Sequence, residues 1–126
     1  MTSYQLQVYQ SSDHRQPFTE WLEGLADRQA RARVQTRLDR LVLGNLGDHR
    51  ALDGGVFELR IDWGPGYRVY LARVGRVVLL LLCGGDKTTQ QKDIERAKAY
   101  FEDYRSRTRT DPNPDARRSR RRKRAV

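Results

Sequence analysis

The sequence has few of the residues on which disulfides and metal sites depend. Its 126 residues include one cysteine, Cys83, and two histidines that lie far apart. A single cysteine makes no internal disulfide and cannot by itself supply a cysteine-based zinc site. We therefore expect no metal and no small-molecule cofactor, and we interpret Cys83, at the end of an apolar run, as a buried structural thiol.

Long hydrophobic runs are also missing. The longest apolar run covers residues 77–83, whereas a membrane-spanning helix needs about 20 apolar residues. No basic stretch followed by an apolar segment opens the chain, so we expect no secretory signal. A chain of 126 residues is long enough for one hydrophobic core. The sequence therefore predicts a soluble, cytoplasmic protein with a single folded domain and no membrane partner.

Acidic residues become scarce towards the C-terminus. The whole chain has 25 Lys and Arg against 16 Asp and Glu, a net charge of +9, and residues 105–126 hold ten of the basic residues but two of the acidic ones. We interpret residues 1–104 as the folded domain and 105–126 as a disordered basic tail. The tail is either a nonspecific RNA or DNA attachment segment or a solvated extension without such a task. Its candidate RNA-binding residues are Arg117, Arg118, Arg120 and Arg121.

Hydrophobic periodicity divides the folded domain into four strands and three helices. Strands are expected where apolar and polar residues alternate or where a short apolar run lies between turns, and helices where apolar residues recur every three or four positions. In chain order these elements are a strand at 4–9, helices at 17–25 and 27–44, strands at 57–61, 67–72 and 77–83, and a helix from 88 to 104. The order β-α-α-β-β-β-α predicts an α+β fold, with a small antiparallel sheet, two N-terminal helices and one C-terminal helix.

Two neighbouring strands carry polar residues on one expected face. Arg60, Arg68 and Tyr70 alternate with apolar residues, so they should lie side by side on the exposed face of the sheet. Lys87 follows the next strand and is expected to overhang the same patch. Arginine binds phosphate through its fork of donors, and tyrosine stacks on bases, which favours RNA binding. The same alternation is typical of any half-exposed strand with local salt bridges, and the residues alone leave both interpretations open.

A histidine is the remaining candidate for acid–base chemistry. His49 lies in the expected loop before the sheet, and an unperturbed histidine pKa near 6.5 suits a general base. No serine lies in a Gly-x-Ser-x-Gly elbow, and no histidine is close to Cys83 in the sequence. His49 is therefore a candidate general base, with an inert loop histidine as the alternative interpretation.

Several segments, taken in order, form a recognisable set. They are a Phe-x-x-Trp-Leu helix at 18–22, Val-Phe-Glu-Leu-Arg-Ile-Asp at 56–62, Gly-Tyr-Arg-Val-Tyr at 66–70, Leu-Cys-Gly-Gly-Asp-Lys at 82–87 and Gln-x-Asp-Ile-x-x-Ala at 91–97. Together they resemble the RelE/ParE superfamily of bacterial toxins, and most closely its HigB-like branch of addiction module killer proteins. The resemblance covers about residues 3–104.

The resemblance implies a function and a set of site residues. RelE-like toxins are ribosome-dependent endoribonucleases that cut mRNA and inhibit translation, and in this branch a helix-turn-helix antitoxin usually neutralises them. On this alignment Arg60 takes the place of a lysine that contacts the substrate, Arg68 that of the arginine that stabilises the scissile phosphate, and Lys87 that of a general acid. The expected partners are therefore mRNA, the ribosome and a cognate antitoxin, and the expected enzyme is metal-independent.

The sequence departs from the family pattern at two positions. Glu58 stands where RelE itself has a lysine, and an acid there is expected to weaken RNA binding. Asp93 or its neighbours stand where RelE has a C-terminal tyrosine that stacks on the cut nucleotide. Two alternatives stay open: a ParE-like inhibitor of DNA gyrase without hydrolytic chemistry, and an inactive member that binds its antitoxin and DNA.

Overall fold

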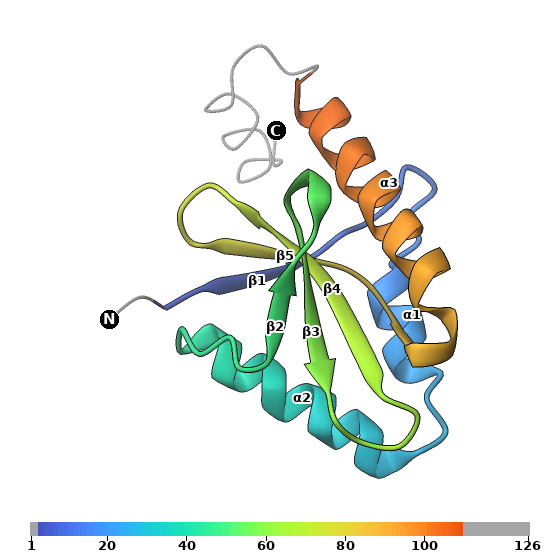
Figure 1. Ribbon diagram of the computed structural model, residues 1–126. Coiled ribbons are helices and arrows are strands. Elements are labelled where there is room, and N and C mark those ends of the chain that lie inside the picture. The colour runs from blue at the N-terminus through green and yellow to red at the C-terminus, as the bar shows by residue number, and fades with distance from the viewer. Residues whose placement is uncertain (1–2, 110–126) are drawn as a thin grey trace.

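A five-stranded sheet with helices on both faces forms the protein (Figure 1). The computed structural model describes residues 3–109. Its elements are β1 (Gln5–Val8), α1 (Pro17–Glu23), α2 (Arg28–Val42), β2 (His49–Ala51), β3 (Val56–Ile61), β4 (Tyr67–Val74), β5 (Val78–Asp86) and α3 (Gln90–Arg109), with short 3-10 turns at Asp53–Gly55 and Lys87–Thr89. The α+β class that the sequence predicts is confirmed.

The strand order across the sheet is β1-β5-β4-β3-β2. Strands β2 to β5 pair antiparallel with their neighbours, as expected for a meander, but β1 pairs parallel with β5. The prediction of an antiparallel sheet is wrong for this edge, because both N-terminal helices separate β1 from the meander and no tight turn sets its direction. Strand β2 was missed, since its three residues are all exposed and show no alternation.

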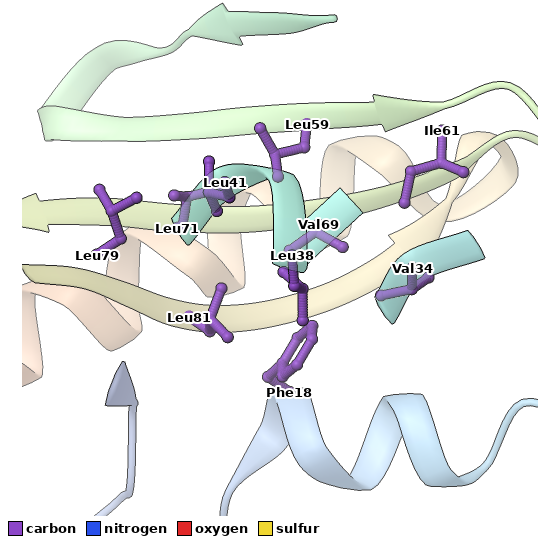
Figure 2. Packing of buried hydrophobic residues seen from close by; sticks show 10 residues of the cluster. All are labelled: Phe18, Val34, Leu38, Leu41, Leu59, Ile61, Val69, Leu71, Leu79 and Leu81. Carbon is purple, nitrogen blue, oxygen red and sulfur yellow. The ribbon is translucent and has the colours of Figure 1, made fainter. Parts of the chain in front are cut away.

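Helices α1 and α2 cover one face of the sheet. The N-terminus of α2 is capped by Asp27, whose side chain accepts hydrogen bonds from the backbone N–H groups of Gln29 and Ala30. Apolar residues of both helices pack against β3, β4 and β5, and this packing forms the larger core cluster (Figure 2). Its buried members are Phe18, Val34, Leu38, Leu41, Leu59, Ile61, Val69, Leu71, Leu79 and Leu81.

Helix α3 covers the opposite face, where Ala97 and Phe101 pack on apolar residues of β3, β4 and β5. A capping box formed by Asp86 and Thr89 precedes the helix. The helix continues to Arg109, five residues past the boundary expected at residue 104. None of the helices within residues 3–109 is both long and apolar enough to cross a membrane.

Candidate functional site

The three basic residues that the resemblance assigns to catalysis line one hollow. Arg60 on β3 and Arg68 on β4 are direct cross-strand partners, and Lys87 is the first residue after β5. The hollow has a volume of about 280 Å³. Its lining residues are Asp48, Arg60, Ile61, Asp62, Gly66, Tyr67, Arg68 and Lys87. Three short motifs from different parts of the chain therefore converge on one site.

A tight connection between β3 and β4 sets this geometry. The turn contains two glycines with left-handed backbone angles, Gly64 at φ 56° and Gly66 at φ 83°. A β-carbon at Gly66 would lie 3.5 Å from the Lys87 β-carbon. This is an ordinary packing distance, so Gly66 is favoured by its left-handed backbone angle, and the Lys87 side chain packs beside the turn.

Asp48 balances the charge of Arg60. The Arg60 Nη2 atom lies 2.7 Å from the Asp48 carboxylate, and this hydrogen bond lowers the Asp48 pKa below its usual range. Like charges directly opposite each other on neighbouring strands destabilise a sheet, so the Arg60–Arg68 pair needs nearby acids. The Asp48 carboxylate supplies one of them.

Glu58 balances the charge of Arg68. The Glu58 side chain is completely buried, and its Oε1 atom lies 3.6 Å from Arg68 and 3.2 Å from Arg50. Its Oε2 atom accepts hydrogen bonds from the Tyr70 hydroxyl and the Gln90 side-chain amide, at 3.1 and 2.8 Å. The Arg68 side chain is only 12% exposed. Arg68 is therefore a largely buried group held beside a buried carboxylate, not the exposed strand residue that alternation predicted.

Tyr70 is unavailable for stacking on a base. Its side chain is fully buried, and both burial and the nearby Glu58 carboxylate raise the pKa of its hydroxyl. Alternation correctly placed Tyr70 and Glu58 on the face opposite Leu59, but helix α3 covers that part of the face. The prediction of an exposed, RNA-binding Tyr70 is wrong for this reason. The length of the β3–β4 turn fixes the strand register, which pairs Glu58 with Tyr70. The sequence could therefore have predicted this pairing, although not the burial of Tyr70.

Arg37 of α2 is a second residue that the sequence analysis missed. Its guanidinium donates hydrogen bonds to the backbone carbonyls of Arg60, Leu46 and Asp48, at 2.5, 2.8 and 2.8 Å. Burial lowers the pKa of this group. The three bonds tie the segment before β2 to β3, and so they hold Asp48 and Arg60 next to each other. The sequence offered one indication of this role, because Arg37 lies next to the buried apolar residues of α2.

His49 lies outside the hollow's lining. It opens strand β2, where it is exposed, and its Nδ1 atom is 2.8 Å from the carbonyl oxygen of Gly47. Its ring stacks against Phe57, with 6.3 Å between the ring centroids. The role of general base for His49 stays a prediction, and this geometry does not favour it.

Comparison with known proteins gives a relative without an assigned function. No family model matches the chain. An uncharacterized protein of Haemophilus influenzae is 52% identical over 81 residues, which cover 64% of this chain and 82% of that protein. The chain belongs to the same family as this Haemophilus protein. That relative carries no assigned activity, so the site is interpreted from its own geometry.

Six further positions singled out in the sequence remain to be placed. Asp93 is buried and pairs with Arg96 at 2.8 Å, while its other oxygen accepts a hydrogen bond from Thr89, so it anchors the start of α3. Cys83 is buried, as predicted, and burial raises its thiol pKa to about 12. Four predicted RNA-binding residues, Arg117, Arg118, Arg120 and Arg121, lie outside the described residues.

Proposed function

We propose that this chain is the toxin of a type II toxin–antitoxin system, a HigB-like member of the RelE/ParE superfamily that cleaves mRNA on the ribosome. The observation that carries the proposal is the hollow in which Arg60, Arg68 and Lys87 meet. These residues come from two strands and the turn after a third strand. A cluster of three cations in a hollow at the end of a sheet suits a polyanionic substrate.

The hollow suits cleavage of RNA by its own 2′-hydroxyl. The 2′-oxygen attacks the adjacent phosphorus, the bond from phosphorus to the 5′-oxygen breaks, and the products are a 2′,3′-cyclic phosphate and a 5′-hydroxyl. The pentacoordinate transition state carries extra negative charge, which fixed guanidinium groups stabilise more than the ground state. Arg68 and Arg60 supply these groups, and Lys87 donates a proton to the leaving 5′-oxygen. Asp62 also lines the hollow, and its carboxylate accepts the 2′ proton in this proposal.

The ion pairs of the hollow fit an enzyme that depends on the ribosome. A phosphate that enters the hollow shares Arg60 with Asp48, so free RNA gains little by binding there. A ribosome that holds and orients the mRNA supplies the binding energy and the geometry that the hollow lacks. Free RNA should therefore be a poor substrate compared with the same RNA in a translating ribosome.

The C-terminal segment supports attachment to RNA. Residues 110–126 contain seven Lys and Arg against two Asp, and the arginines at 117, 118, 120 and 121 belong to this run. Deleting 110–126 should weaken RNA binding and make it less dependent on salt, because each lost phosphate contact reduces the salt slope by roughly 0.7 for single strands. Helix α3 stays complete in this truncation. If the truncated protein binds RNA with the same salt dependence as the full chain, residues 110–126 do not contact the RNA.

Cell-free translation tests the proposal. Purified protein is added to a translation reaction, and primer extension maps the mRNA ends. The expected result is internal cuts that appear only with ribosomes present, that persist with a metal chelator on pre-assembled complexes, and that disappear when the product of the neighbouring reading frame is added as antitoxin. Intact mRNA combined with relaxed plasmid DNA in cells would instead support a gyrase inhibitor. Intact mRNA with unaltered supercoiling would instead support an inactive member that binds its antitoxin and DNA.

A further inference from the structure

Glu58 is a fully buried carboxylate at the boundary between the hollow and the core under α3. Burying a carboxylate is costly unless it is paired and hydrogen-bonded. Glu58 meets both conditions, because Arg50 and Arg68 face one oxygen and the donors of Tyr70 and Gln90 face the other. Its side chain points to the same sheet face as Arg68, one residue pair away from the Arg60–Arg68 pair.

The hydrogen bonds to Oε2 of Glu58 determine where its other carboxylate oxygen, Oε1, points. Donors from β4 and α3 hold Oε2, so the carboxylate plane has little freedom to rotate. Oε1 then faces the guanidinium of Arg68 at 3.6 Å. The Nε atom of Arg68 is buried and makes no hydrogen bond. Within the described chain, the Glu58 Oε1 atom makes no hydrogen bond either, so the carboxylate acts on the Arg68 guanidinium through its charge, in an ion pair at 3.6 Å.

We propose that Glu58 is a positioning residue, which holds the Arg68 guanidinium in the orientation required at the scissile phosphate. The proposal rests on the proposed nuclease function and deepens it. It also reverses the expectation for this position, since an acid exposed to RNA would repel it. Glu58 does not face the hollow as an exposed charge, and it is absent from the hollow's lining. It acts through Arg68, in the way that a buried acid orients a catalytic cation.

The test compares Glu58→Gln with a matched control. Glutamine keeps the size of the side chain and one acceptor oxygen but removes the charge that attracts Arg68. Asp103→Asn is the control, because Asp103 also accepts a tyrosine hydroxyl and an arginine, Tyr9 and Arg107, at the far part of α3. Each variant loses one carboxylate that binds a tyrosine hydroxyl and an arginine. Glu58 is buried on β3 beside the first residue of α3, whereas Asp103 is part-exposed on α3 itself, away from the hollow.

Single-turnover cleavage of ribosome-bound mRNA gives the first readout. We expect Glu58→Gln to cut roughly 10 to 100 times more slowly, as misplacement of a catalytic group does, with unchanged ribosome affinity, and Asp103→Asn to cut at the wild-type rate. In an Arg68→Ala background, Glu58→Gln should cause no further loss. Wild-type cleavage by Glu58→Gln, or an independent loss in the Arg68→Ala background, would overturn the proposal.

Nitrogen NMR of the arginine side chains gives a readout that needs no cleavage. In the wild type, the Nη groups of Arg68 should rotate slowly about the Nε–Cζ bond and give separate resonances, which Glu58→Gln should merge and Asp103→Asn should leave separate. Merged Arg68 resonances in the wild type would overturn the positioning role, even if Glu58→Gln fails to fold. A wild type that cuts no mRNA but shows separate, Glu58-dependent resonances would reject the nuclease function alone.

Discussion

Two halves of one sheet face differ in their surroundings although their strands are continuous. Under helix α3, Glu58 and Tyr70 stand opposite each other and both are fully buried. One pair further along the same face, Arg60 and Arg68 stand opposite each other and line the hollow. Alternation along a strand determines which face a side chain takes, but whether that face is covered depends on where a helix from elsewhere in the chain ends.

The covered half supports the open half. Under α3, the Tyr70 hydroxyl and the Gln90 amide donate hydrogen bonds to one oxygen of Glu58, and the other oxygen faces Arg68 at the border. On the open side, Asp48 and the Arg37 bonds hold Arg60 by its side chain and its backbone. Each arginine of the hollow thus has its own support, and variants of the two halves should separate activity from stability.

The largest effect is expected in the open half, at Arg68. Arg68→Lys keeps a positive charge beside Glu58, so the fold should survive, but it replaces the planar fork by a point charge. Losing one well-placed transition-state contact costs about 10² to 10³ in rate. Single-turnover cleavage should fall by this factor, while circular dichroism stays that of the wild type.

Arg68→Ala is the less suitable variant, because it leaves the buried Glu58 carboxylate short of a partner and lowers stability as well as activity. Near-normal cleavage by Arg68→Lys would show that the arginine contributes only charge. In that case the open half would differ from the covered half in exposure, but it would hold no arginine whose planar fork is needed for cleavage.

Much of this arrangement follows from the sequence, and the part that does not has physical reasons. Hydrophobic periodicity predicted the strands of the meander, the shared face of Arg60 and Arg68, and helix α2. The direction of β1 and the presence of β2 did not follow, since one depends on a long connection and the other on three polar residues. The burial of Tyr70 depends on the packing of a helix about 20 residues further along the chain, which no local pattern contains.

The next effect is expected in the covered half, at Tyr70. Tyr70→Phe removes the hydroxyl that donates to Glu58 at 3.1 Å and leaves Gln90 as the donor to that oxygen. A buried acceptor that loses a donor costs about 1 to 3 kcal/mol of unfolding free energy. Urea denaturation should show a lower midpoint with an unchanged slope. Unchanged stability would mean that a water takes the place of the hydroxyl and that this half is less dry than its burial indicates.

Alkaline pH should act on the covered half before the open half. Burial and the nearby Asp103 raise the pKa of Tyr9 from its usual value of about 10 to about 12, and burial raises the pKa of Tyr70 as well. The unfolded chain releases these protons above about pH 10, while the folded protein retains them. The contribution of these two tyrosines to stability should therefore be constant below about pH 10 and decline from there to beyond pH 12. Tyrosine absorbance that titrates fully near pH 10 in the folded protein would contradict the burial of both hydroxyls.

The smallest effect is expected at His49, at the edge of the open half. His49→Ala should change single-turnover cleavage by no more than about twofold, as exposed residues without special roles do. Its Nδ1 faces the Gly47 carbonyl and its ring rests on Phe57, so neither group is directed at the hollow. A true general base would contribute about 10² to 10⁴ in rate. A dead His49→Ala beside an active Arg68→Lys would therefore move the chemistry to β2, and Arg60 and Arg68 would then serve to hold the RNA.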